Sequence, residues 1–120
     1  ERRITRQEAL LRVEPESPLA YLSLGSVVLE QNTSEPDPAR RRALIEEARG
    51  YFLRGIELER QPRLLANLAL VEGTLAEIDP AGAAEHRARA LEWSTAAMRR
   101  AEELDLVEIE LRLNHATHLF

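Results

Sequence analysis

One short sequence occurs twice in this chain of 120 residues. Asp37-Pro38-Ala39 returns as Asp79-Pro80-Ala81, 42 residues later, and with the same offset Tyr51 aligns with Trp93. A repeat of this length is typical of chains in which one small unit is stacked on copies of itself, because a single unit cannot bury its own apolar face. The repeat therefore restricts the fold more than any single motif does.

Both copies of the repeat carry the signals of a helix start. An aspartate at the N-cap accepts a hydrogen bond from an unpaired backbone N–H, and a proline at the first helical position loses no bond. Strong helix formers (Ala, Leu, Glu and Arg) dominate the composition, and only 4% of the residues are aromatic. The sequence therefore predicts an all-α fold. The predicted helices span residues 2–13, 18–31, 38–60, 63–77, 80–104 and 106–120.

A second recurring element places a small residue inside a predicted helix. It occurs as Ser23-Leu24-Gly25, Asn67-Leu68-Ala69 and Asn114-His115-Ala116. A glycine in a helix interior costs about 1 kcal/mol relative to alanine. We therefore expect Gly25 to mark a point where a neighbouring helix comes close.

The segment before the first such element contains two prolines. In "RVEPESPLAYLSLG", Pro15 prevents a preceding helix from continuing, and Ser17 is the predicted N-cap of a helix that begins at Pro18. These prolines therefore predict a joint between helices inside one domain rather than a linker between two domains.

The pattern of these residues resembles the tetratricopeptide repeat, whose unit has the form W-x2-L-G-x2-Y, then A-x3-F, then P. The matching residues are Tyr21, Leu24, Gly25 and Val28 in a first helix, Ala48 and Phe52 in a second, and Pro15 at the end of a preceding unit. The spacing of 42–47 residues exceeds the usual ~34 of that family. The resemblance implies a right-handed α-solenoid of antiparallel helix pairs with about six helices. Another helical repeat and an ordinary helical bundle remain alternatives.

The resemblance also divides the chain into units. Residues 1–15 close a preceding unit, 16–62 form unit one, 63–105 form unit two and 106–120 form the first helix of a further unit. Because the chain starts with Glu1 and ends in an apolar segment without a cap, we expect it to be part of a longer protein.

In this family the first helix of each pair lines a concave groove that holds a peptide or a partner helix. Carried over position by position, the candidate groove residues are Leu22, Ser26, Leu29, Arg63, Ala66, Asn67, Leu70, Glu110, Leu113, Asn114 and Thr117. The amides of Asn67 and Asn114 can each donate to and accept from an extended peptide backbone. Alternatively, they bond to the backbone of a neighbouring helix and hold the joint between units.

These features predict a non-catalytic module for protein–protein interaction, in which the partner is a peptide, a helix or a second copy of the chain. The alternative is a sensor or scaffold segment of a larger bacterial regulator of transcription or signalling. No enzyme is predicted, because there is no nucleophile motif, and carboxylates such as Glu46 and Glu47 are adjacent and point about 100° apart on a helix.

No cofactor or metal is predicted either. The chain has no cysteine. His115 and His118 lie three residues apart and share a helix face, with Glu110 a turn further back, but two histidines alone make a weak metal motif. The segment "LRLNHATHLF" and the first predicted helix are the uncapped ends through which we expect self-association.

The charges are interspersed, with a formal net charge of −5 and arginine as the only basic residue apart from histidine. No basic stripe predicts binding to nucleic acid. Arg40-Arg41-Arg42 and His86 are predicted to be solvated, whereas Tyr51 and Trp93 are predicted to pack between helices. No apolar run reaches the ~20 residues of a membrane span, so a cytoplasmic location is expected, although the absence of cysteine equally suits the periplasm.

Overall fold

The computed structural model of the protein describes residues 17–118, and of residues 111–118 the backbone alone. Within this range every regular element is a helix, which confirms the all-α prediction. The elements are α2 (Pro18–Gln31), η1 (Asn32–Ser34), α3 (Pro38–Leu58), α4 (Pro62–Ile78), η2 (Pro80–Gly82) and α5 (Ala83–His118). The helix predicted over residues 2–13 lies outside the described residues.

Three of the predicted helix starts have the expected caps. The side chains of Ser17, Asp37 and Asp79 each accept a hydrogen bond, at 3.2–3.3 Å, from a backbone N–H two or three residues further along. Each is followed by a proline at the start of its helix. The second Asp-Pro first forms the short 3₁₀ turn η2, and α5 begins after it. Capping by short polar side chains therefore determines where these helices begin.

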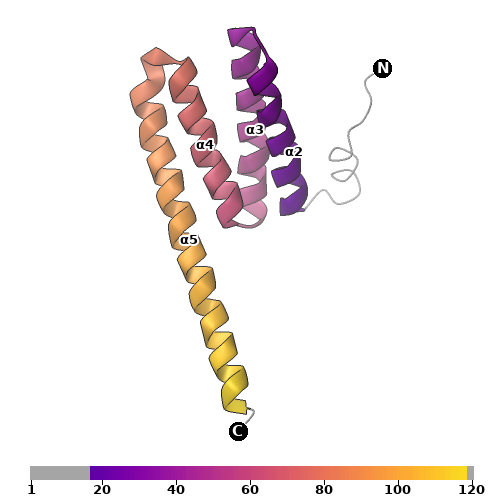
Figure 1. Ribbon diagram of the computed structural model, residues 1–120, viewed down its shortest axis with the longest axis vertical. Helices are drawn as coiled ribbons and strands as arrows, with labels where there is room; N and C mark the ends of the chain where they lie inside the picture. Colours follow the sequence, from indigo (N-terminus) through magenta and orange to yellow (C-terminus); the bar gives the residue numbers. More distant parts are fainter. Residues whose placement is uncertain (1–16, 119–120) are drawn as a thin grey trace, which may run out of the picture.

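The four α-helices lie side by side in the order of the sequence, and each runs opposite to the one before it (Figure 1). Each helix contacts the next one along the chain, and α2 also contacts α4. Apart from the adjoining turn η2, α5 contacts only α4 among the described elements. Its second half continues well beyond the end of the other helices (Figure 1).

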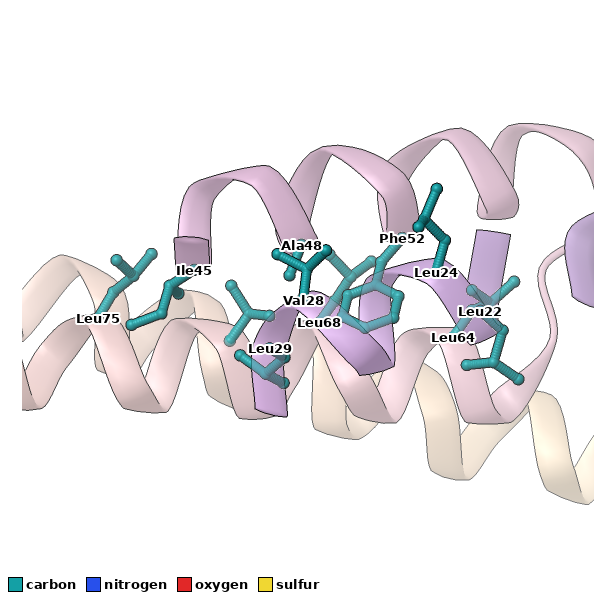
Figure 2. Close-up of a cluster of buried hydrophobic side chains, with 11 residues drawn as sticks. Leu22, Leu24, Val28, Leu29, Ile45, Ala48, Phe52, Leu64, Leu68 and Leu75 are labelled. Carbon is teal, nitrogen blue, oxygen red and sulfur yellow. The ribbon is translucent and has the colours of Figure 1, made fainter. Parts of the chain in front are cut away.

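The core is centred on Phe52, which α3 directs between α2 and α4 (Figure 2). A Cβ atom on Gly25 would lie 2.5 Å from Cε1 of the Phe52 ring, so a larger residue at this point of α2 would have to displace the ring. The prediction that Gly25 is a point of close helix approach is therefore confirmed. Ile45, Leu64, Leu68 and Leu75 are buried in the same cluster.

The aromatic residues that the repeat aligns also pack as expected. Tyr51 and Trp93 are partly buried and lie against the same core. Tyr51 additionally donates its hydroxyl hydrogen to Glu47 at 3.3 Å. The two aromatic positions of the repeat therefore contribute to packing between helices.

One predicted break is wrong. We expected one helix to end at residue 104 and another to begin at 106, but α5 is continuous from Ala83 to His118. This range contains neither glycine nor proline, and an aspartate such as Asp105 costs well under 1 kcal/mol inside a helix. The described residues accordingly hold four α-helices, and residues 106–118 form no separate helix. None of the described helices, α5 included, combines the length and apolar character that a membrane crossing requires.

Candidate functional site

A groove with a volume of about 430 Å³ runs between α2 and α4, and η1 and the first turn of α3 close one end of it. Ten residues line it. They are Ser26, Leu29 and Glu30 from α2, Asn32 and Thr33 from η1, Arg41 from α3, and Asn67, Leu70, Thr74 and Glu77 from α4.

The two leucines give the groove an apolar wall on either side. Leu29, near the C-terminal end of α2, is almost completely buried and belongs to the core, whereas Leu70 on α4 is exposed by more than half of its surface. A ligand side chain that entered between them would cover the exposed Leu70. Removal of such a leucine from water on binding is favourable by up to about 2 kcal/mol.

Three polar groups in the groove have no partner among the described residues. They come from three different helices and are the Arg41 guanidinium, the Ser26 hydroxyl and the side-chain oxygen of Asn67. The Nε atom of Arg41 is shielded from solvent and makes no hydrogen bond. A buried donor left without an acceptor costs about 1–3 kcal/mol. The groove therefore contains unsatisfied hydrogen-bonding capacity next to an apolar wall.

Other polar groups of the groove bond within their own segment of the chain. The Asn67 amide nitrogen donates to the carbonyl oxygen of Arg63 at 3.0 Å, and the Thr74 hydroxyl donates to that of Leu70 at 2.8 Å. These bonds hold the side chains of α4 in one orientation. The alternative in which Asn67 bonds to the backbone of a neighbouring helix is therefore wrong, because its amide donates within α4.

The structure brings together four of the residues that the sequence proposed for a groove. Ser26, Leu29, Asn67 and Leu70 all line the space between α2 and α4. Arg63 is exposed near the start of α4 and lies outside the groove. The prediction that Leu22 lines the groove is wrong, because Leu22 is buried in the core and is not available to a ligand.

The candidates from the last predicted unit do not belong to this groove. Glu110, Asn114 and Thr117 lie in the second half of α5, and α5 makes no contact with α2. The continuous α5 accounts for this correction, since no turn brings these positions back beside α4. Glu110 is exposed. The side chains of residues 111–118, which include His115 and His118, lie outside the described ones.

Sequence reasoning missed Arg41, which it placed on a solvated charged face. The signal was present, because Arg41 precedes the core residue Ile45 by four positions and therefore shares its helix face. Its neighbours behave as expected of surface arginines. Arg40 lies 3.9 Å from Glu35 and Arg42 lies 3.3 Å from Glu46.

A second polar cluster lies away from the groove, where α4 meets α5. Glu72 is 0% exposed, and its Oε2 lies 2.7 Å from Nδ1 of His86, which is 8% exposed. The other ring nitrogen of His86 is 3.4 Å from Asp79. The prediction that His86 is solvated is therefore wrong, because the histidine is one side of a buried contact between two helices.

Arginines from α3 complete this cluster. Arg49 Nε lies 3.3 Å from Glu72 Oε1, and Arg42 lies 3.7 Å from Asp79. A buried carboxylate needs such partners, because an unpaired buried charge is strongly destabilising. Within the described residues no group of three or more acidic or histidine side chains is arranged to hold a metal ion. The cluster ties α3, α4 and α5 together.

Comparison of the chain with models of protein families, with curated proteins and with solved structures finds no match. The groove and its chemistry are consequently the basis for a functional assignment.

Proposed function

We propose that this chain is a non-catalytic interaction module of the tetratricopeptide type, a right-handed stack of helix pairs that binds a peptide or a partner helix between α2 and α4. The observation that carries the proposal is the groove itself. Three unpartnered polar groups from three helices converge there beside an apolar wall. Small-molecule and peptide sites commonly combine an apolar surface with a few placed polar groups.

The pattern of helix contacts supports the stacking part of the proposal. In a stack of helix pairs, each pair contacts its neighbouring pairs. Here α4 contacts both α3 and α2. Gly25 and Phe52 occupy the glycine and aromatic positions of the tetratricopeptide pattern, and their close approach gives both a packing role within the first pair.

The charges of the groove indicate the chemistry of the ligand. Arg41 at the closed end has no acceptor and suits a single carboxylate or a backbone carbonyl of the ligand. Glu30 and Glu77 also line the groove and disfavour a ligand that carries many acidic groups. We therefore propose a peptide with one acidic group, an aliphatic side chain placed against Leu70, and no further net negative charge.

A library of random 12-residue peptides displayed on phage would test this proposal. Selection on the folded chain should enrich sequences with one acidic and one aliphatic residue at a fixed spacing. Synthetic peptides of that pattern should bind in fluorescence polarisation. Arg41→Ala should weaken binding by at least tenfold, because Arg41 is the only cation that lines the groove among the described residues.

Arg54→Ala is the matched control. Arg54 is another arginine of α3, but it is exposed and lies on another face, beside Gly50 and Tyr51. This variant should bind the same peptides with unchanged affinity. Equal losses in the two arginine variants, or selection of peptides without a shared pattern, would contradict the proposed groove function.

A further inference from the structure

The outer face of α5 carries a stripe of exposed apolar side chains. Leu91 is 70% exposed and Met98 is 65% exposed, and Leu106 and Ile109 are exposed as well. Their spacings of seven, eight and three residues keep them on one side of a helix with 3.6 residues per turn. We call these four residues the outer stripe.

The opposite side of α5 is the one that packs on the rest of the protein. Ala83 and His86 are buried, and Trp93 lies against the core. His86 and Trp93 lie more than a quarter of a turn away from every residue of the outer stripe, whereas Ala83 lies about 60° from Met98. The outer stripe is therefore unused by the contacts between α4 and α5.

The second half of α5 extends past α4 and has no helix packed on its inner side among the described residues (Figure 1). Arg100 donates from Nε to the carbonyl oxygen of Arg60 at 3.1 Å, and Arg60 lies just before the start of α4. From residue 101 the helix continues for about 27 Å at 1.5 Å per residue (Figure 1). Leu104 and Val107 expose apolar surface on further faces of this part. Apolar residues around a whole helix are typical of a helix that is covered by other elements.

The charge along α5 changes sign between its two halves. Residues 83–100 carry four arginines and two glutamates, whereas residues 101–118 carry five acidic residues and one arginine. A helix with this distribution complements a second copy of itself that runs in the opposite direction, because each arginine-rich half then lies beside an acidic half. A parallel copy would place like charges beside each other.

We infer that two copies of this chain associate through the outer stripes of their α5 helices, in antiparallel orientation about a two-fold axis. The symmetry makes every favourable contact occur twice. It also gives each projecting acidic half a neighbour, namely the first half of the partner's α5. This surface is separate from the groove between α2 and α4, so the inference goes beyond the proposed groove function and does not depend on it.

Charge reversal provides the test. One variant carries Arg87→Glu and Arg99→Glu, and the other carries Glu102→Arg and Asp105→Arg. All four side chains are exposed and make no ion pair within the described residues, so the monomer should keep its fold, as circular dichroism would verify. Analytical ultracentrifugation of the 13.6 kDa chain should show a dimer, and each variant alone should dimerise at least tenfold more weakly.

An equimolar mixture of the two variants is the decisive sample. In an antiparallel pair the introduced glutamates of one chain face the introduced arginines of the other, and the unchanged charges face each other with opposite sign too. Native mass spectrometry should therefore show the mixed dimer with an affinity close to that of the original chain.

The control variant, Arg40→Glu with Arg54→Glu, makes the same change in net charge as Arg87→Glu with Arg99→Glu, but on α3, which has no contact with α5. It should dimerise as the original chain does. If the original chain stays monomeric at about 200 µM, a concentration at which even a weak dimer would form, the inference is overturned. Variants that remain dimeric, a mixture that stays monomeric, or an α3 control that dissociates equally would also overturn it.

Discussion

The two helix pairs of this protein are held together by different chemistry. In the first pair, α2 and α3 meet where Gly25 faces the ring of Phe52. In the second pair, α4 and α5 meet where buried Glu72 bonds to His86. Ser94, which the repeat aligns with Phe52, is exposed, so the second pair does not reuse the contact of the first.

This difference determines what each joint tolerates. The first joint depends on the absence of a side chain, so it is sensitive to added volume, because close-packed interiors do not yield to extra atoms. The second joint depends on matched polar partners, so it is sensitive to the loss of one partner while the other stays buried. The predictions that follow use this contrast.

The largest expected effect is that of Gly25→Leu. Even a Cβ atom at this position would lie 2.5–2.9 Å from three atoms of the Phe52 ring, and because Phe52 is fully buried, its ring cannot shift without disturbing the packing of the core. We expect a loss of about 3 kcal/mol or more in the free energy of unfolding, at the upper end for overpacked cores. Urea denaturation followed by circular dichroism would measure it.

Gly50→Leu is the control for that substitution. Gly50 lies in α3, and a Cβ atom there would meet nothing within 4 Å. The same change should therefore leave the protein as stable as before or slightly more so, because leucine favours the helix. Equal stability of the two leucine variants would show that the first joint does not depend on the missing side chain.

An intermediate effect is expected at the second joint. His86→Leu leaves the buried Glu72 carboxylate without its 2.7 Å partner. We expect a loss of about 2–3 kcal/mol, as for a hydrogen bond to a charged group. The double variant with Glu72→Leu removes both partners and should regain most of this loss, because apolar replacement of a buried polar pair is often neutral.

The comparison between the single and the double variant is the sensitive measurement. A double variant that is less stable than His86→Leu would mean that Arg49, the second partner of Glu72, contributes the larger part of this joint. The stabilising polar contact would then be the one between α3 and α4, and not the one between α4 and α5.

Much of this fold is predictable from local sequence. The caps at Ser17, Asp37 and Asp79 and the close approach at Gly25 follow from residue types that have few other uses in a helix. The groove residues Ser26 and Asn67 were proposed by carrying a pattern over, and the structure places them together.

The errors at Arg41 and His86 share one physical cause, which is that neighbours in sequence are not neighbours on a helix. Arg41 and His86 were assigned to solvent because charged residues flank them. Arg41 is nevertheless four positions from the buried Ile45, and His86 is three positions from the buried Ala83. The missing break in α5 is a different error, because Leu104-Asp105 resembles a turn only in its polarity and contains no residue that stops a helix.

The smallest expected effect is a gain in stability from Gly73→Ala, opposite in sign to the loss expected from Gly25→Leu. Gly73 lies inside α4, and a Cβ atom there would meet nothing within 4 Å. Gly73→Ala should stabilise the protein by about 1 kcal/mol, because alanine loses less conformational freedom when the helix forms. Gly25→Ala makes the same change in α2 and gains the same helix propensity, but its Cβ meets Phe52 and should destabilise the protein. Thermal unfolding of the two alanine variants should therefore shift the melting temperature in opposite directions. A shift in the same direction would mean that helix propensity, and not contact with Phe52, decides the role of Gly25.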